Sequence, residues 1–135
     1  MTIVDTGPLV ALLNKADPHH EWAVGQTKTL PAPLSTCEAV LTETFFLVAS
    51  SQKAVSRLFE LLECGALSVE YRATVWLPEL RELMWKYRDL PMSFADACLV
   101  RMSEMAEEAP VFTIDSDFHV YRRVGQKPIS VVMPT

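Results

Sequence analysis

The segment Met1-Thr-Ile-Val-Asp5-Thr-Gly-Pro-Leu-Val-Ala-Leu-Leu13 is the part of the chain that decides the fold. Its first residues, Thr2-Ile-Val-Asp5, predict a short buried strand that ends in an acid. Gly7 permits a tight corner after that strand, and Pro8 suits the first turn of a helix, where a missing N–H costs nothing. The segment therefore predicts a strand, a turn and a helix in immediate succession.

Helices and short apolar strands alternate along the rest of the chain. Helices are predicted from the candidate N-cap Asp17 to about Thr29, from a Ser35-x-x-Glu38 capping box to about Ser50, over 52–63, through the periodic residues Trp76 to Tyr87, and from a Ser93-x-x-Asp96 capping box to about Glu108. Strands or extended segments are predicted at 30–34, 66–69, 110–114 and 129–133, with a short helical turn between 117 and 121. This alternation favours one α/β domain over residues 1–135 with a mostly parallel central sheet.

The composition excludes several classes of protein. Of 135 residues, 50% are hydrophobic and the formal net charge is −5, which argues against disorder and against binding nucleic acid or anionic membranes by charge alone. Apolar runs are far shorter than the roughly 20 residues of a membrane helix, and no basic segment precedes an apolar one at the start. The cysteines Cys37, Cys64 and Cys98 form no CxxC motif, which fits a reduced cytoplasm.

Four acids stand at positions where chemistry is expected. Asp5 and Asp115 end two predicted strands, and ligands bind at the carboxyl edge of open parallel sheets. Glu43 and Asp96 lie on predicted helices between apolar neighbours three and four residues away, so both are expected on a buried stripe. Because an unpaired buried carboxylate is costly, four such acids gathered at one edge would bind a divalent cation.

Each acid also has a purely structural interpretation. Asp5 is a possible cap of the first helix, and Asp96 is a possible partner in the capping box of its own helix. Glu38 is interpreted first as a cap, while Asp115 and Asp117 are typical turn formers after a strand. Only the convergence of the acids separates the two interpretations.

Four segments together resemble the PIN domain family, which includes the toxins of VapBC-type toxin–antitoxin pairs. They are Ile3-Val-Asp5-Thr-Gly-Pro-Leu-Val-Ala-Leu-Leu13, Thr36-Cys-Glu-Ala-Val-Leu-Thr-Glu43, Ser93-Phe-Ala-Asp96-Ala-Cys-Leu-Val100 and Val111-Phe-Thr-Ile-Asp115-Ser-Asp-Phe118. The resemblance covers essentially the whole chain in the right order. It implies a three-layer α/β/α sandwich and a ribonuclease that depends on Mg²⁺ or Mn²⁺ and leaves 5′-phosphate and 3′-hydroxyl ends.

The resemblance also implies roles for individual residues. The family's four acids fall on Asp5, Glu43, Asp96 and Asp115, with Asp117 as an alternative for the fourth place and as a further metal ligand. Thr6 and Thr113 are expected to orient ligands or water, and Glu38 is a possible additional acid behind the metal ligands. The histidines at 19, 20 and 119 are expected at helix starts as surface or capping residues.

RNA contacts are expected from basic residues around the acidic site. Arg122, Arg123 and Lys127 are the first candidates, followed by Lys86 and Arg88, although each also fits a solvated charged edge. The three tryptophans at 22, 76 and 85 are candidates for base stacking, and the helical spacing of Trp76 predicts a core position for that residue.

The resemblance further implies partners: an RNA substrate, a small antitoxin that covers the pocket with a helix or tail, and a homodimer. Apolar residues of the second and fourth helices are candidates for the dimer interface or, equally, for the core: Trp22, Val24, Phe59 and Leu62. The alternative function is a non-catalytic PIN-like module that binds RNA or protein. A haloacid-dehalogenase-like enzyme is disfavoured, because Asp5-Thr-Gly7 lacks the second acid of an Asp-x-Asp motif.

Overall fold

Five short parallel strands form the central sheet of the computed structural model, which describes residues 1–135. The strands are β1 (Thr2–Val4), β2 (Leu34–Ser35), β3 (Leu67–Ser68), β4 (Val111–Phe112) and β7 (Val131–Val132), in the spatial order β3-β2-β1-β4-β7. Every neighbouring pair is parallel. The predicted parallel sheet is confirmed, although its strands are shorter than the sequence pattern indicates.

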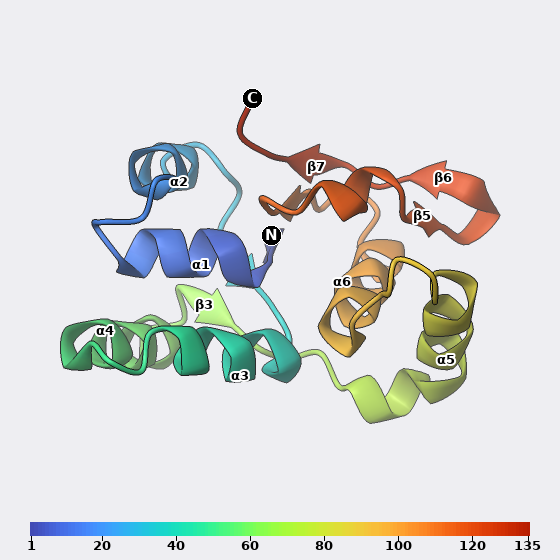
Figure 1. The fold of residues 1–135 in the computed structure, drawn as a ribbon, viewed down its shortest axis with the longest axis horizontal. Coiled ribbons are helices and arrows are strands. Elements are labelled where there is room, and N and C mark those ends of the chain that lie inside the picture. The colour runs from blue at the N-terminus through green and yellow to red at the C-terminus, as the bar shows by residue number, and fades with distance from the viewer.

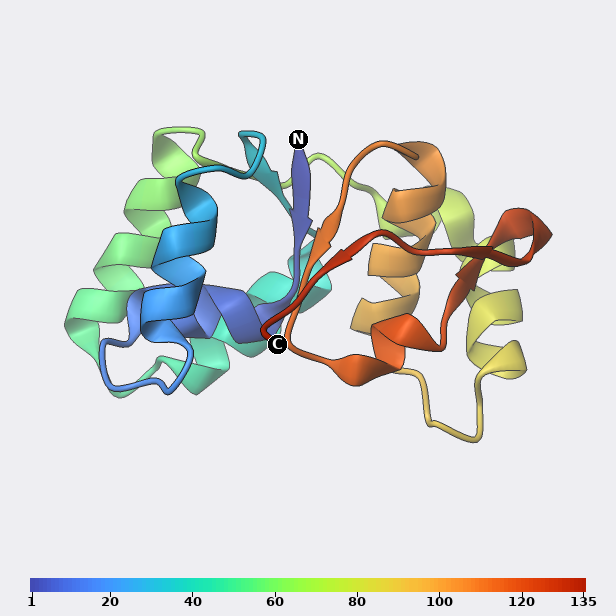
Figure 2. The ribbon, with the colours of Figure 1, turned by 90° about the horizontal axis from the view of Figure 1, so that it is seen from above.

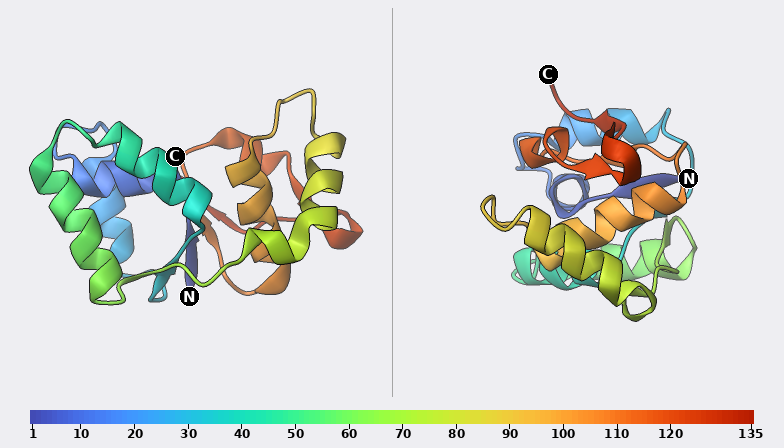
Figure 3. Two further views of the ribbon diagram at one scale, coloured as in Figure 1. Left: turned by 90° about the horizontal axis from the view of Figure 1, so that it is seen from below. Right: turned by 90° about the vertical axis from the view of Figure 1, so that its right-hand side faces the viewer.

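Six helices cover the two faces of this sheet. They are α1 (Thr6–Leu13), α2 (His20–Thr27), α3 (Glu38–Leu47), α4 (Gln52–Glu63), α5 (Leu77–Lys86) and α6 (Phe94–Met105). Helices α1 to α4 lie on one side of the strands and α5 and α6 on the other (Figure 1; Figure 3, left). The three-layer α/β/α sandwich implied by the resemblance is confirmed.

Short elements complete the chain. Three 3₁₀ turns are present: η1 (Ala73–Trp76), η2 (Ser116–His119) and η3 (Val124–Gln126). A small antiparallel hairpin of β5 (Arg122–Arg123) and β6 (Lys127–Pro128) follows η2. No helix is both long enough and apolar enough to cross a membrane.

The helix boundaries show which local signals decide them. Ser93 caps α6 by accepting a hydrogen bond from the Asp96 N–H at 3.0 Å, as predicted. The predicted cap Ser35 is wrong, because that residue lies in β2, paired with Ile3 of β1 and Ser68 of β3, and Cys37 occupies the N-cap of α3 instead. Strand pairing on both sides therefore overrides the local capping signal.

Other boundaries differ by a few residues from those predicted. Asp17 accepts a hydrogen bond from the His19 N–H, and α2 begins only at His20. Helices α3 and α6 end at Leu47 and Met105, earlier than predicted. Gly65 follows the end of α4 with a φ of 81°, the left-handed conformation in which a glycine commonly ends a helix.

The core lies between the sheet and the helices. Its largest fully buried side chains include Ile3, Leu9, Leu58, Leu99, Phe112, Phe118 and Tyr121. Helix α6 contributes the continuous buried run 97–100, and on α3 the buried residues are Val40 and Thr44. Trp76 packs against this core without being fully buried, and the Arg101 guanidinium lies 4.2 Å from the centre of its ring.

Candidate metal centre

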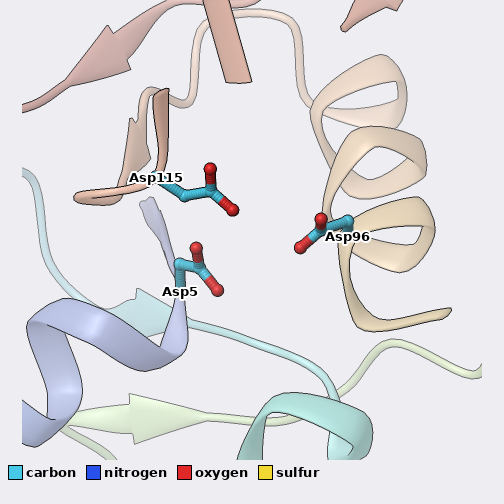
Figure 4. Close-up of side chains that lie close together, drawn as sticks. All are labelled: Asp5, Asp96 and Asp115. Carbon is cyan, nitrogen blue, oxygen red and sulfur yellow. The ribbon is translucent and has the colours of Figure 1, made fainter. Parts of the chain in front are cut away.

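Three carboxylates meet where β1 and β4 end. Asp5 follows β1 and is the N-cap of α1, Asp115 follows β4 and is the N-cap of η2, and Asp96 lies in the first turn of α6. One oxygen from each lies within 4.8 Å of the others (Figure 4). The strand order reverses direction at this pair of strands, which is where open parallel sheets bind ligands.

Asp5 is the most enclosed of the three, with 8% of its surface exposed. Its Oδ1 accepts a hydrogen bond from the Thr6 N–H at 2.7 Å, so the capping interpretation holds. Its Oδ2 accepts one from the Thr113 hydroxyl, also at 2.7 Å. The Thr113 hydroxyl oxygen in turn accepts the Asp115 N–H at 3.0 Å, so this threonine joins the ends of β1 and β4.

Asp115 combines a turn-forming role with membership of the cluster. Its carboxylate accepts a hydrogen bond from the Asp117 N–H at 2.9 Å, which is the turn-former interpretation of the sequence. Asp117 itself is half-buried on η2 and is not one of the three clustered acids. Of the two alternatives for the fourth acid, the structure brings Asp115 to the other carboxylates.

Asp96 does not complete the capping box that its spacing predicts. Its N–H donates to Ser93, but its carboxylate accepts a hydrogen bond from the Tyr121 hydroxyl at 2.7 Å and faces the other acids (Figure 4). Tyr121 is fully buried, with edge-on contacts to Tyr87 and Phe118. Sequence analysis missed Tyr121, because nothing in its neighbourhood signals a contact with a residue 25 positions earlier.

The electrostatics of the cluster favour a bound cation. Burial raises the pKa of Asp5 from 3.8 to about 6, against the opposing effect of its two hydrogen bonds, and the charges of Asp96 and Asp115 raise it further. Burial also raises the pKa of Asp96, with the Tyr121 hydrogen bond lowering it and the Asp115 charge raising it. A positive charge at this point would relieve both desolvation and mutual repulsion.

The donor set fits a hard divalent cation. Asp5, Asp96 and Asp115 present carboxylate oxygens, the ligands that Mg²⁺ and Mn²⁺ prefer. The hydroxyl oxygen of Thr6 is buried and has no hydrogen-bond partner within the protein, so it is free to hold a water molecule. These residues are the ones that would hold the ion.

Comparison with known proteins shows what the chain as a whole resembles. No family profile matches the chain. The chain is 26% identical over 141 residues to ribonuclease VapC26 of Mycobacterium tuberculosis, an alignment that covers 96% of this chain and 98% of that protein. The crystal structure of VapC20 from the same organism, described as a sarcin-ricin loop cleaving toxin, superposes with a TM-score of 0.75 at 22% identity, covering 89% of this chain and 94% of that one. The chain is thus similar in sequence to a VapC ribonuclease and shares the fold of VapC20. Its acidic cluster lies in a fold that it shares with VapC20.

The fold does not place every expected acid in the cluster. Glu43 is exposed on α3, so the expectation that it projects from a buried stripe is wrong. The reason is that α3 has apolar residues around most of its circumference, and the structure buries Val40, Thr44 and Val48 instead. Glu38 is also exposed, in the first turn of the same helix.

The first candidates for RNA contact lie on the β5–β6 hairpin, whereas Lys86 and Arg88 lie at the C-terminal end of α5. The Arg122 guanidinium donates hydrogen bonds to the carbonyl oxygens of 119, 120 and 121, and that of Arg123 donates to the Glu107 carbonyl. Lys127 is exposed. The side chains of Arg122 and Arg123 are therefore engaged in hydrogen bonds to backbone carbonyls, whereas Lys127 is exposed to solvent.

The histidines and the candidate dimer residues are placed as follows. The His20 ring nitrogen Nδ1 lies 2.7 Å from the Ala11 carbonyl oxygen, His19 is the N-cap of α2, and His119 is exposed. Trp22 packs against Phe112, at 5.2 Å between ring centres. The remaining candidates for the dimer interface are Val24 and Leu62, which are half-buried, and Phe59, which is 51% exposed.

Proposed function

We propose that this PIN domain is a metal-dependent endoribonuclease of the VapC toxin type. The observation that carries the proposal is the meeting of Asp5, Asp96 and Asp115 within 4.8 Å at the carboxyl edge of the sheet. The similarity to a curated ribonuclease over nearly the whole chain supports it. Phosphodiester hydrolysis is the reaction for which a cage of carboxylates around Mg²⁺ or Mn²⁺ is suited.

The protein's part in this reaction is to hold oxygens in fixed positions. Thr113 and the Thr6 N–H orient the two oxygens of Asp5, and Tyr121 orients Asp96. The turn at η2 fixes Asp115 through the Asp117 N–H. When bound, one or two divalent ions activate a water molecule and stabilise the charge on the phosphate and on the leaving oxygen. The carboxylates would hold such an ion at the carboxyl edge of the sheet and balance its charge.

Glu43 is part of the proposed catalytic set, because the resemblance assigns it the helical acid. It acts, on this proposal, from the exposed side of α3 rather than from within the buried cluster. Asp117 is proposed as an additional metal ligand, and its negative charge adds to the field at Asp96. Glu38 and the two threonines at 6 and 113 are proposed to support the ligands.

Cleavage of RNA in defined metal conditions tests the proposal. Purified protein is incubated with an RNA mixture in Mg²⁺, in Mn²⁺ or in EDTA, and the product ends are mapped. We expect 5′-phosphate ends in either metal, no cleavage in EDTA, and near-total loss in Asp96→Asn. Glu63→Gln, at an exposed position at the end of α4, is the matched control, and Asp117→Asn and Glu43→Gln test the two acids proposed outside the three-acid cluster. Wild-type cleavage by Asp96→Asn would refute the proposal.

The same proposal includes partners. We propose a small antitoxin that lays a helix or tail across the acidic site, where a Lys or Arg side chain would take the place of the cation. We also propose that basic residues, Lys127 above all, meet the phosphates of the substrate, and that the protein forms a homodimer. The three free thiols fit the cytoplasm, which is the compartment we propose.

A further inference from the structure

Trp85 is exposed in a way that core packing does not explain. It lies in the last turn of α5 and exposes 67% of its surface. The other two tryptophans, Trp22 and Trp76, are half-buried and pack against the core. A large aromatic ring held in solvent is a typical feature of a binding surface.

The Trp85 ring is held in place by a cation. The Arg88 guanidinium carbon lies 4.1 Å from the centre of a Trp85 ring, and Arg88 Nη1 donates a hydrogen bond to the Trp85 carbonyl at 2.8 Å. Both contacts come from residues three positions apart at the end of α5. The indole and the guanidinium therefore form a stacked pair, and both residues remain exposed. We call this pair the Trp85–Arg88 platform.

Tyr87, which lies between the platform residues in the sequence, connects this segment with the acidic cluster through Tyr121. Tyr87 accepts a hydrogen bond from the Arg122 N–H at 2.9 Å and packs edge-on against Tyr121, at 5.1 Å between ring centres. Tyr121 donates its hydroxyl to Asp96. The segment from α5 to α6 also protrudes at the same end of the molecule as η2 and the C-terminal end of β4 (Figure 2; Figure 3, right). The C-terminal end of α5, which carries the platform, therefore lies at the same end of the molecule as the carboxyl edge of the sheet (Figure 2).

The charges around the platform suit a polyanion with aromatic bases. Lys86 and Arg88 are exposed cations on either side of Tyr87, and the Lys86 ammonium lies 5.2 Å from the Tyr87 ring. Asp89 and Glu82 are the nearby acids in the sequence, so the patch is mixed rather than strongly basic. Its specificity would therefore come from stacking, with the cations meeting phosphates.

We propose that the Trp85–Arg88 platform stacks an unpaired base of the RNA substrate and so positions the strand for cleavage at the acidic cluster. This inference rests on the proposed ribonuclease function. A paired base is already stacked between its neighbours, so the platform selects an unpaired segment. Trp85 is a positioning residue here, because it touches the substrate away from the scissile phosphate.

Tryptophan fluorescence of the full chain tests the platform directly. Asp5→Asn protein, in which cleavage is prevented, is titrated with a single-stranded RNA oligonucleotide and with the matching duplex. We expect the single strand to quench the emission and the duplex to quench it little. In the Asp5→Asn background, Trp85→Phe should abolish most of the quenching, whereas Trp22→Phe should keep it. Equal quenching with and without Trp85 would overturn the proposal.

RNA affinity and cleavage kinetics give a second test of the platform. A purely structural role of Trp85 would not change them in the way described here. Trp85→Ala should weaken single-stranded RNA binding by about 5- to 150-fold, the range that corresponds to the loss of one base–aromatic stack. In cleavage assays it should raise KM with little change in kcat. Phe46→Ala, which removes an aromatic residue that is 79% exposed on α3, is the matched control and should change neither.

The outcomes separate this inference from the proposed function. If the wild type cleaves RNA and Trp85→Ala binds and cleaves equally well, the platform is refuted and the ribonuclease assignment stands. If the wild type cleaves no RNA in any metal, the ribonuclease assignment fails, and the quenching titration still decides whether the platform binds unpaired bases. Loss of self-association in Trp85→Ala with unchanged RNA affinity would assign the surface to a second copy of the chain and overturn the proposal.

Discussion

Replacing Asp5 by Asn should make the metal-free protein more stable at neutral pH while abolishing cleavage. Burial and the neighbouring charges raise the pKa of Asp5 from 3.8 to about 6, so the folded protein binds this proton more tightly than the unfolded chain does. The stabilising contribution of the protonated group is complete below about pH 4 and is lost as the pH rises through about 6. At pH 7.5 the wild type therefore carries an ionised carboxylate in an unfavourable place.

The size of the effect follows from the shift. A pKa that is raised by about two corresponds to about 3 kcal/mol of free energy. This is the upper limit for the gain in free energy of unfolding when the Asp5 charge is removed. Asn keeps an oxygen for the Thr6 N–H, and its amide can donate to the Thr113 hydroxyl oxygen, so the contact with Thr113 is kept with the direction of its hydrogen bond reversed. For a domain of this size each kcal/mol raises Tm by roughly 3–5 °C. We expect Asp5→Asn to melt up to ~15 °C higher.

Thermal and urea unfolding in EDTA from pH 4 to pH 8 measures this difference. The gain should be largest at pH 7 to 8 and should fade towards pH 4, where the wild-type carboxyl is already protonated in the folded state. Glu63→Gln, at an exposed position at the end of α4, is the control for loss of a carboxylate from the surface. An Asp5→Asn protein that is less stable than the wild type at pH 7.5, or a gain that does not depend on pH, would refute the reasoning.

Three further changes test separate parts of the site. Mn²⁺ at about ten times its Kd should stabilise the wild type by about 1.4 kcal/mol in thermal unfolding, and Asp96→Asn should lose this response. An undiminished response of Asp96→Asn would show that the ion binds elsewhere. Thr113→Val removes the donor to Asp5 and the acceptor for the Asp115 N–H, so urea unfolding should show a loss of about 1–3 kcal/mol. Gly7→Ala would drive its Cβ against Cγ1 and Cδ1 of Ile114, and we expect a Tm decrease equivalent to about 1–3 kcal/mol, with an unchanged Tm contradicting the packing.

The parts of the site that sequence predicts correctly are those fixed by local geometry. Asp5 and Asp115 follow apolar strands of a parallel sheet, and topology alone brings the ends of such strands to one edge. Ser93 begins α6 because its hydroxyl caps the helix within one turn. These signals need no knowledge of distant contacts, so a single sequence is sufficient for them.

The parts that sequence misplaces depend on tertiary contacts. The buried side of α3 is ambiguous because its apolar residues surround the helix, and only packing against neighbouring helices selects Val40 and Thr44 over the side that carries Glu43. Ser35 has a good capping sequence, but pairing with strands on both sides requires an extended backbone there. In both cases a non-local interaction outweighs a local preference.

Asp96 shows why the cluster is better explained by function than by stability. The capping box would place its carboxylate on the Ser93 N–H, where a negative charge at a helix N-terminus is favourable. The side chain instead faces Asp5 and Asp115 and accepts a hydrogen bond from Tyr121, where burial and like charges raise its pKa. A buried tyrosine that holds a carboxylate among other carboxylates stabilises an arrangement that the metal-free fold does not favour. A bound cation removes that conflict, because it turns the repulsion among the three acids into shared coordination.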